Sequence, residues 1–246
     1  MRNDNVEMHK KEHLPQFILR TRFTRRGPLS FIGHLDLMKV IERAVRRADL
    51  PILHTQGYNP RPVMVFALPL GVGIDTTGDY VDVAMSVPME ADEFLDRIRP
   101  QLPQGLEFIS ARQIGEPKDS IMSIVSAAAY SLEAPGITQK ILDLFSLEKV
   151  ETQKKSKGKI KTVDIRPLMI KPLTTSTPDR ADIMVYAGSE KNLRPDVLLA
   201  ALCEQTGYGK DKADECIVTR TALYGGTYPD IKELSELEIK YKENNI

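Results

Sequence analysis

His34 is the residue whose type and position could most directly support acid–base chemistry. It stands beside Gly33 at the start of a helical stretch, in a segment rich in arginine. An imidazole titrates near neutral pH, so it could act as a general acid or base on a phosphate ester. The alternative is a histidine that only caps or packs the start of the helix. No second histidine, lysine or tyrosine is fixed beside it by the local sequence, which favours the structural role.

Basic residues gather in two regions of a chain whose formal net charge is zero. Residues 16–66 hold nine basic and three acidic residues, and residues 148–171 hold eight basic and three acidic ones. Between these regions, residues 75–133 hold eleven acidic and four basic residues. Patches of one sign on a neutral protein indicate a surface that faces a polyanion; ordinary surface charge that happens to cluster is the alternative.

Arg61 and Arg166 each lie directly before a proline, in the stretches QGYNPRPVMVFALPLGVG and DIRP. The residue before a proline favours an extended conformation. We therefore expect a stiff backbone that presents each guanidinium to a planar or phosphate group. The segment from Gln56 to Arg61 is predicted to be a rigid presentation loop beside the helix that starts at His34. A turn stiffened only for stability is the alternative.

Few aromatic side chains are available to stack on bases, so we expect contacts with RNA mainly to its backbone and shape. The candidates for stacking are Phe23, Tyr58 and Phe66. The lysine-rich stretch after residue 153 could bind phosphate non-specifically or be a solvated loop. The predicted binding residues are Arg20, Arg22, Arg43, Arg47, Gln56, Tyr58, Asn59, Arg61, Lys157, Lys159, Lys161, Asp164 and Arg166.

Motifs for cofactor binding are absent from the sequence. Gly71 and Gly73 do not form the dinucleotide fingerprint, and no Walker sequence occurs. Cys203 and Cys216 lack metal-ligand spacing, and the cysteine triad that holds the cluster of radical SAM enzymes is missing. Asp36 suits the positive end of a helix dipole better than a metal. We expect no metal site and no cofactor.

The elements that position these residues follow from two periodicities. Alternation predicts strands at residues 16–25, 79–87 and 106–114, with Arg20 and Arg22 on the open face of the first and with Tyr80, Asp82, Ala84 and Ser86 outward on the second. Shorter strand pieces are expected at residues 52–55 and 63–70. Helical spacing predicts helices at residues 32–49 and 89–102. In the first of these helices the exposed side is expected to carry Lys39, Arg43, Arg46 and Arg47.

This element order, strand–helix–strand–strand–helix–strand, is repeated more weakly after residue 126. We therefore predict an α+β fold of two tandem ferredoxin-like (βαββαβ) units with antiparallel sheets. The expected parts are a disordered leader (1–15), a first unit (16–115), a second unit (126–226) and a charged tail (227–246) that forms a solvated helix. Two cysteines and no secretory signal fit a reducing cytoplasm, and no apolar run is long enough to span a membrane.

Three motifs resemble the radical-SAM-linked protein family, a bacterial domain of unknown function: GPLSFIGHLDLMKVIERAVRRADLP, TQGYNPRPVMVFALPLGVG and DIRP. That family occurs alone or fused behind a cobalamin-binding radical SAM protein. The resemblance covers about residues 17–222. Gly33 stands where the family usually has serine, and glycine still caps a helix acceptably. The resemblance implies a functional link to a radical SAM enzyme.

We therefore expect an accessory, bacterial and cytoplasmic protein that binds RNA and presents it to a cobalamin-dependent radical SAM enzyme acting in trans, in RNA modification. One alternative is a metal-independent RNA-processing enzyme that uses His34. The predicted architecture is similar to that of CRISPR-type RNA-processing endonucleases, which is an analogy of fold only. The other alternative is a docking module that contacts only the radical SAM partner.

Overall fold

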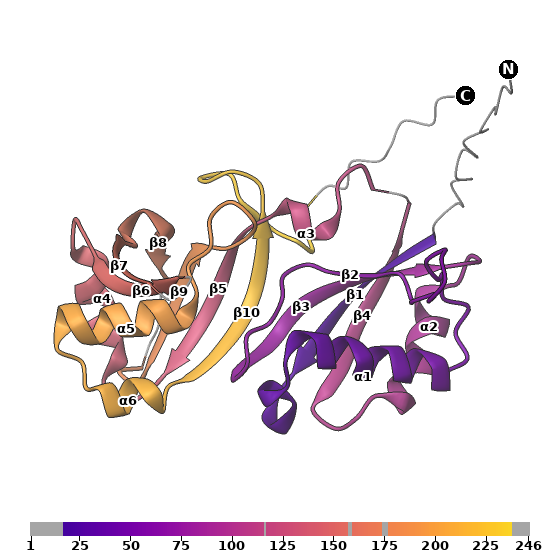
Figure 1. The fold of residues 1–246 in the computed structure, drawn as a ribbon, viewed down its shortest axis with the longest axis horizontal. Coiled ribbons are helices and arrows are strands. Elements are labelled where there is room, and N and C mark those ends of the chain that lie inside the picture. Colours follow the sequence, from indigo (N-terminus) through magenta and orange to yellow (C-terminus); the bar gives the residue numbers. More distant parts are fainter. Residues whose placement is uncertain (1–16, 116, 157–158, 174–176, 238–246) are drawn as a thin grey trace, which may run out of the picture.

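The fold is mixed α+β, built on a nine-stranded, mostly antiparallel sheet with helices packed against it (Figure 1). The computed structural model describes residues 17–115, 117–156, 159–173 and 177–237, and side chains at 154–160 are outside this description. The predicted leader at residues 1–15 lies outside the described residues.

The first half of the chain contains four strands and two α-helices. These elements are β1 (Phe17–Arg25), α1 (His34–Arg47), β2 (Met64–Phe66), β3 (Ile74–Met85), α2 (Ala91–Ile98) and β4 (Leu106–Ile114). Short 3-10 turns precede α1 and follow α2, at Gly27–Phe31 and Arg99–Gln101.

The second half contains the other elements, including a hairpin that stands apart from the large sheet. These elements are α3 (Ile121–Ile124), β5 (Val125–Glu133), α4 (Ile137–Ser146), β6 (Glu151–Ser156), β7 (Lys159–Asp164), β8 (Met169–Pro172), β9 (Arg180–Tyr186), α5 (Pro195–Thr206), α6 (Lys210–Asp214), β10 (Ile217–Gly225) and β11 (Lys232–Glu233). Pro195 begins α5 because its missing N–H is not needed in the first turn.

One sheet runs through both halves in the order β4-β1-β3-β10-β5-β9-β8, with β2 beside β3 and β11 beside β10. The halves join where β3 and β10 pair in parallel over three residues, Ile74 to Thr76 against Val218 to Arg220. This single sheet differs from the two separate antiparallel sheets expected from the sequence. In the first half β1 lies between β4 and β3, and in the second half β5 lies between β10 and β9. The tandem ferredoxin-like arrangement stays a prediction.

The first core forms between α1, α2 and one face of the strands. Leu37, Ile41 and Val45 face inward from α1 because they recur at helical spacing, and they pack with Leu19 and Phe23 of β1. A second core fills the other half around β5, β9, α4 and α5. Burial of these apolar stripes fixes the orientation of α1, so that its opposite side faces solvent.

The other face of β1 and β3 is covered, contrary to the expectation of an open face. Ile18 and Ala84 pack there under Leu53 and Val63, from the chain on either side of the loop at residues 54–62. Tyr80, Asp82 and Ala84, expected to point outward, are buried. The alternation of the sequence therefore located the strands, but it did not reveal that a distant loop covers their second face.

Two further expectations are wrong in the described residues. The strand expected from Val63 to Leu70 is only three residues long, because β3 turns its other end to β10 and the chain from Leu68 leaves the sheet. The tail is not a solvated helix up to residue 237. It forms β11 on β10, and Leu234 is fully buried in the second core.

Candidate functional site

The exposed side of α1 carries a row of basic side chains, as predicted from its spacing. Lys39, Arg43 and Arg47 follow one another at intervals of four, and Arg46 is exposed beside them. We call these four residues the basic ridge. The row begins at Leu35, which is 70% exposed although it is apolar. Because the apolar side of α1 is fixed by the core, packing of that side is enough to hold the ridge outward.

Most of the basic ridge is free to meet a ligand. Lys39 Nζ lies 3.2 Å from Asp36 Oδ1, and both side chains are exposed, so this pair holds little energy. Arg47 donates a hydrogen bond to the carbonyl oxygen of Gln101. Arg43 and Arg46 have no hydrogen-bond or ion-pair partner among the residues the structure describes. A polyanion would therefore displace almost nothing from the ridge.

The loop that follows α1 is exposed at its tip and held at its base. The N–H of Thr55 donates to the carbonyl of Arg61 (2.8 Å), and the N–H of Arg61 donates to Thr55 Oγ1 (3.0 Å). Gln56, Tyr58 and Asn59 are exposed beyond this closure, as is the side chain of Arg61. A hydrogen-bonded base with an exposed tip is the geometry that a presentation loop needs.

The sequence led us to expect this loop beside His34, but the structure places it elsewhere. The chain leading into it is bound to the last residues of β3, since the N–H of Leu53 donates to Ala84 and that of Ala84 to Val63. His34 lies near the other end of the first half, where Arg25 holds the carbonyls of Ile32 and Ile74. The part of the motif near the start of α1 is instead its second half, from Phe66 to Gly73.

The arginines of β1 are not on an open face. Arg20 is only 4% exposed, and its Nε and Nη2 donate to the two carboxylate oxygens of Asp82 at 2.8 Å each. The two residues lie directly opposite in the register of β1 and β3, which explains the pairing. Arg22 is half-buried, with its guanidinium over Gly78. The expectation of an exposed basic strand is therefore wrong for Arg20 and holds only partly for Arg22.

His34 is the first residue of α1, and its ring packs edge-on against Phe66 with centroids 4.9 Å apart. Burial holds the pKa of His34 below its usual value of 6.5, and the charges of Arg220 and Arg25 lower it further against the opposing effect of Asp79. The ring is therefore neutral at pH 7. Its Nδ1 is buried with no hydrogen-bond partner among the described residues. This packing supports the structural role more directly than the catalytic one.

Only one of the three predicted stacking aromatics is accessible. Phe23 and Phe66 are buried in the first core, whereas Tyr58 is fully exposed at the loop tip. The sequence reading missed Phe31, which is 72% exposed just before α1. Its signal was its place at the end of the GPLSF turn, outside any apolar stripe.

The second basic region is a hairpin, β6–β7, rather than a loop. Lys161 is exposed on it; Lys157 and the side chain of Lys159 lie outside the described residues. Asp164 and Arg166 hold the chain instead of presenting charge. Asp164 Oδ1 accepts the N–H groups of Val150 and Arg166 (3.0 Å each), and these bonds hold the pKa of Asp164 below its usual value.

Arg166 is likewise committed to the chain itself. Its Nε donates to the carbonyl of Leu147 (2.9 Å) and its Nη1 to that of Met169 (3.1 Å). It also begins a 3-10 turn instead of an extended segment, so the expectation of a guanidinium presented from extended backbone is wrong here. The hairpin and α1 lie toward opposite ends of the long axis of the molecule (Figure 1), so the two basic regions do not line one short groove.

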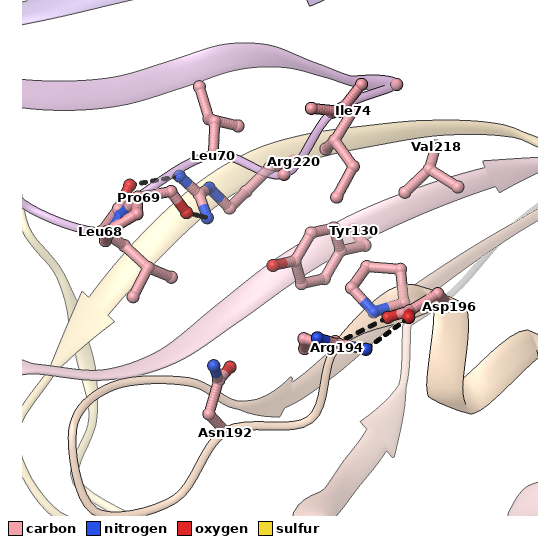
Figure 2. Close-up of a pocket in the computed structure, with 14 residues that line it drawn as sticks. Leu68, Pro69, Leu70, Ile74, Tyr130, Asn192, Arg194, Asp196, Val218 and Arg220 are labelled. Atoms are coloured by element: carbon pink, nitrogen blue, oxygen red, sulfur yellow. Dashed lines mark hydrogen bonds and ion pairs between the residues drawn. The ribbon is translucent and has the colours of Figure 1, made fainter. Parts of the chain in front are cut away.

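A pocket of about 570 Å³ lies where the two halves meet, and the sequence reading did not anticipate it (Figure 2). One wall is the segment from Leu68 to Ile74, and the facing wall is the turn into α5, from Asn192 to Asp196. Tyr130 of β5, with Val218 and Arg220 of β10, forms the floor between them. We call this the junction pocket. Its residues come from four separate stretches of the chain, so only the fold brings them together.

Buried arginines hold the wall of the junction pocket in place. Arg220 donates from Nε and Nη2 to Asp79 (2.8 and 2.6 Å), and Nη2 also donates to the carbonyl of Leu68 (2.8 Å). Burial alone would lower the pKa of Arg220, but Asp79 outweighs this and raises it, so the side chain stays charged. Arg25 reaches the same wall, donating to the carbonyl of Gly71 (2.9 Å).

Other reactive side chains do not form a second site in the described part of the chain. Burial raises the pKa of the Cys216 thiol to about 11, so it is not a nucleophile at neutral pH. No three His, Cys, Asp or Glu side chains gather as a metal site within the described ranges. No helix there is long and apolar enough to cross a membrane.

Comparison with protein families identifies a family to which most of the chain is similar. A family model described as "Uncharacterized protein conserved in bacteria (DUF2344)" matches residues 19–195. The match runs from β1 to the first residue of α5, and so includes the basic ridge, the exposed loop and most of the junction pocket. Its description names neither RNA nor a radical SAM enzyme. A search of curated proteins finds no match.

Proposed function

We propose that this chain, which belongs to the DUF2344 family of uncharacterized proteins conserved in bacteria, is an RNA-binding module that assists a cobalamin-dependent radical SAM enzyme in trans. The basic ridge of α1 carries the proposal. Its exposed side chains Lys39, Arg43 and Arg46 point to solvent at the spacing of one helix face. Cations in this arrangement attract a phosphate backbone without reading its sequence.

The fold itself does not require these charges. In the second half, α4 follows β5 as α1 follows β1, and its exposed residues include Gln139, Leu142 and Asp143. A helix in this setting can therefore pack with a nearly neutral outer face. Packing of α1 therefore does not account for the charges of the ridge, and a role in binding does.

The acidic residues next to the ridge restrict where RNA would lie. Asp92, Glu93 and Asp96 are exposed on α2, which packs beside α1 in the first half. Like charges repel a polyanion, so an RNA strand on α1 is directed away from α2. One direction that stays open leads along α1 to its first residues and the junction pocket. The basic ridge supports RNA binding only. The radical SAM partner is proposed from the resemblance of the three sequence motifs.

The test is binding of purified protein to tRNA and rRNA fragments by fluorescence anisotropy over a range of salt concentrations. We expect binding at low salt and a linear fall of the logarithm of the association constant with the logarithm of salt concentration, with a slope of about −0.7 for each phosphate neutralised on a single strand. Absence of binding at low salt would overturn the proposal. The partnership is tested by co-purification with a cobalamin-binding radical SAM protein from the same bacterium.

A second candidate, a module that docks only a partner protein, is favoured by three exposed apolar side chains near the start of α1. Phe31, Leu35 and Val72 are 72%, 70% and 63% exposed. The carbonyl of Ser30 accepts from the N–H of Gly73 (2.7 Å), which brings the segments of Phe31 and Val72 together. Co-purification of the radical SAM protein that survives nuclease treatment, is lost in Phe31→Ser/Leu35→Ser, and retains no RNA would favour this candidate.

A further inference from the structure

The junction pocket has the composition of a site for a flat, partly polar group. Leu68, Ile74 and Val218 line it with apolar side chains (Figure 2). Its volume of about 570 Å³ lies within the range of small-molecule sites, roughly 300 to 1,000 Å³. Apolar side chains of this kind can cover the faces of a heteroaromatic ring, which are exposed to water once the ring leaves a stack.

Three exposed polar side chains of the pocket stand together on one side. Asn192, Arg194 and Asp196 come from the turn into α5, facing the Leu68–Ile74 wall (Figure 2). Arg194 and Asp196 orient each other through two hydrogen bonds, from Nε (3.0 Å) and Nη2 (2.6 Å). An amide, a guanidinium and a carboxylate together offer the donors and acceptors that match the edge of a nucleobase.

The pocket wall adjoins the start of α1, the helix that carries the basic ridge. Arg25 bonds both to the carbonyl of Gly71, in the pocket wall, and to that of Ile32, two residues before α1. The N–H of Gly73 donates to Ser30 on the same side. Leu35 and Phe31, the exposed apolar residues there, therefore lie between the ridge and the pocket wall. A strand whose phosphates follow α1 reaches the pocket at the end of the helix.

We propose that the junction pocket takes one unstacked nucleobase of the RNA strand bound along α1. This inference rests on the proposed function and deepens it, since it makes one nucleotide of the strand the group that the protein singles out. Phosphate contacts on the ridge position the strand without reading it, and the pocket then holds a single base away from its neighbours. A base held in this way is accessible to an enzyme that acts on it.

The experiment uses a single-stranded oligoribonucleotide with 2-aminopurine in place of one base at a time. We expect the fluorescence of 2-aminopurine to rise on binding at one position, because the base leaves its stack. Asn192→Trp fills the mouth of the pocket from an exposed turn and should abolish this rise, with about a tenfold loss of affinity. Glu204→Trp, exposed near the other end of α5, is the matched control and should bind as the unaltered protein does.

The outcomes separate this inference from the proposed function. If RNA binds with the expected salt dependence but no position shows a fluorescence rise that Asn192→Trp removes, the pocket inference is wrong and the RNA-binding proposal stands. If RNA does not bind at low salt, the proposed function fails. Titration with the four nucleoside monophosphates, followed by NMR, then decides whether the pocket still binds a nucleotide. If no chemical-shift change on adding a nucleotide is removed by Asn192→Trp, the pocket does not bind a nucleotide and the pocket inference is wrong as well.

Discussion

The arginines of the sheet and the arginines of α1 are chemically alike and have opposite settings. Arg20, Arg25 and Arg220 are buried on strands, where carboxylates or backbone carbonyls occupy their guanidinium groups. Arg43 and Arg46 stand in solvent on one helix face. A count of basic residues in the sequence combines these groups, although the first stabilises the sheet and only the second can meet a ligand. The difference predicts that substitutions will separate stability from binding.

The largest effect is expected at the buried pair of Arg220 and Asp79. Arg220→Met leaves the carboxylate of Asp79 buried and uncompensated and frees the carbonyl of Leu68, so the free energy of unfolding should fall by about 3–5 kcal/mol. Urea denaturation measures this. The double variant Arg220→Met/Asp79→Leu should recover much of the loss. If Arg220→Met is as stable as the unaltered protein, the buried arginines of the sheet do not stabilise it to this extent.

The next effect is expected on binding instead of stability. Arg43→Gln/Arg46→Gln removes two exposed charges and should weaken RNA binding about tenfold at low salt. The slope of the logarithm of the association constant against the logarithm of salt concentration should become shallower by the amount expected for about one to two phosphate contacts. The free energy of unfolding should stay within about 0.5 kcal/mol of the original. Anisotropy and urea denaturation give the two values.

Lys210→Gln/Lys212→Gln is the matched control for this pair of substitutions. It also removes two positive charges, but from exposed positions on α6 in the other half of the chain. We expect almost unchanged RNA binding. If both variants lose affinity equally, net charge and not the basic ridge carries the binding.

His34 responds to the buried group of arginines, because burial and the charges of Arg220 and Arg25 lower its pKa. Its neutral form is favoured in the folded state, so its contribution to stability is complete above its usual pKa of 6.5 and is lost as the pH falls toward the lowered folded value. The fall in Tm from about pH 7.5 to 5.5 should therefore be smaller in His34→Gln.

Exposed His54 offers the control for this titration. His54→Gln should keep the pH dependence of Tm found in the unaltered protein. Equal pH dependence in the unaltered protein and His34→Gln would contradict the assignment. Loss of an RNA product in His34→Ala, with Tm unchanged, would instead revive the catalytic alternative.

The smallest effect is expected at the tip of the exposed loop. Tyr58 is fully exposed, so Tyr58→Ala should change the free energy of unfolding by less than about 0.5 kcal/mol. If RNA extends past the end of α1 to the loop, the loss of one stacked base should weaken binding about threefold or more. No change in affinity would restrict the bound strand to the ridge and the pocket.

Local patterns in the sequence predicted those helices and strands whose buried side is set by periodicity alone. The strand at residues 106–114 and the helix beginning near His34 follow from alternation and helical spacing, and both are present. The same patterns misplaced Arg20, because Asp82 and the chain around Leu53 come from elsewhere in the chain. The junction pocket was missed for the same reason, since its walls and floor come from separate strands and turns.

The short parallel pairing of β3 with β10 has a consequence for synthesis on the ribosome. Thr76 Oγ1 donates to the carbonyl of Arg220, which is 144 residues further along the chain. This edge of β3 is synthesised before its partner strand and stays without it until β10 follows, and an unpaired edge can join the same edge of another nascent chain. The basic ridge is complete at that stage, but the pocket floor is not. Selection of a base can begin only after β10 has been translated.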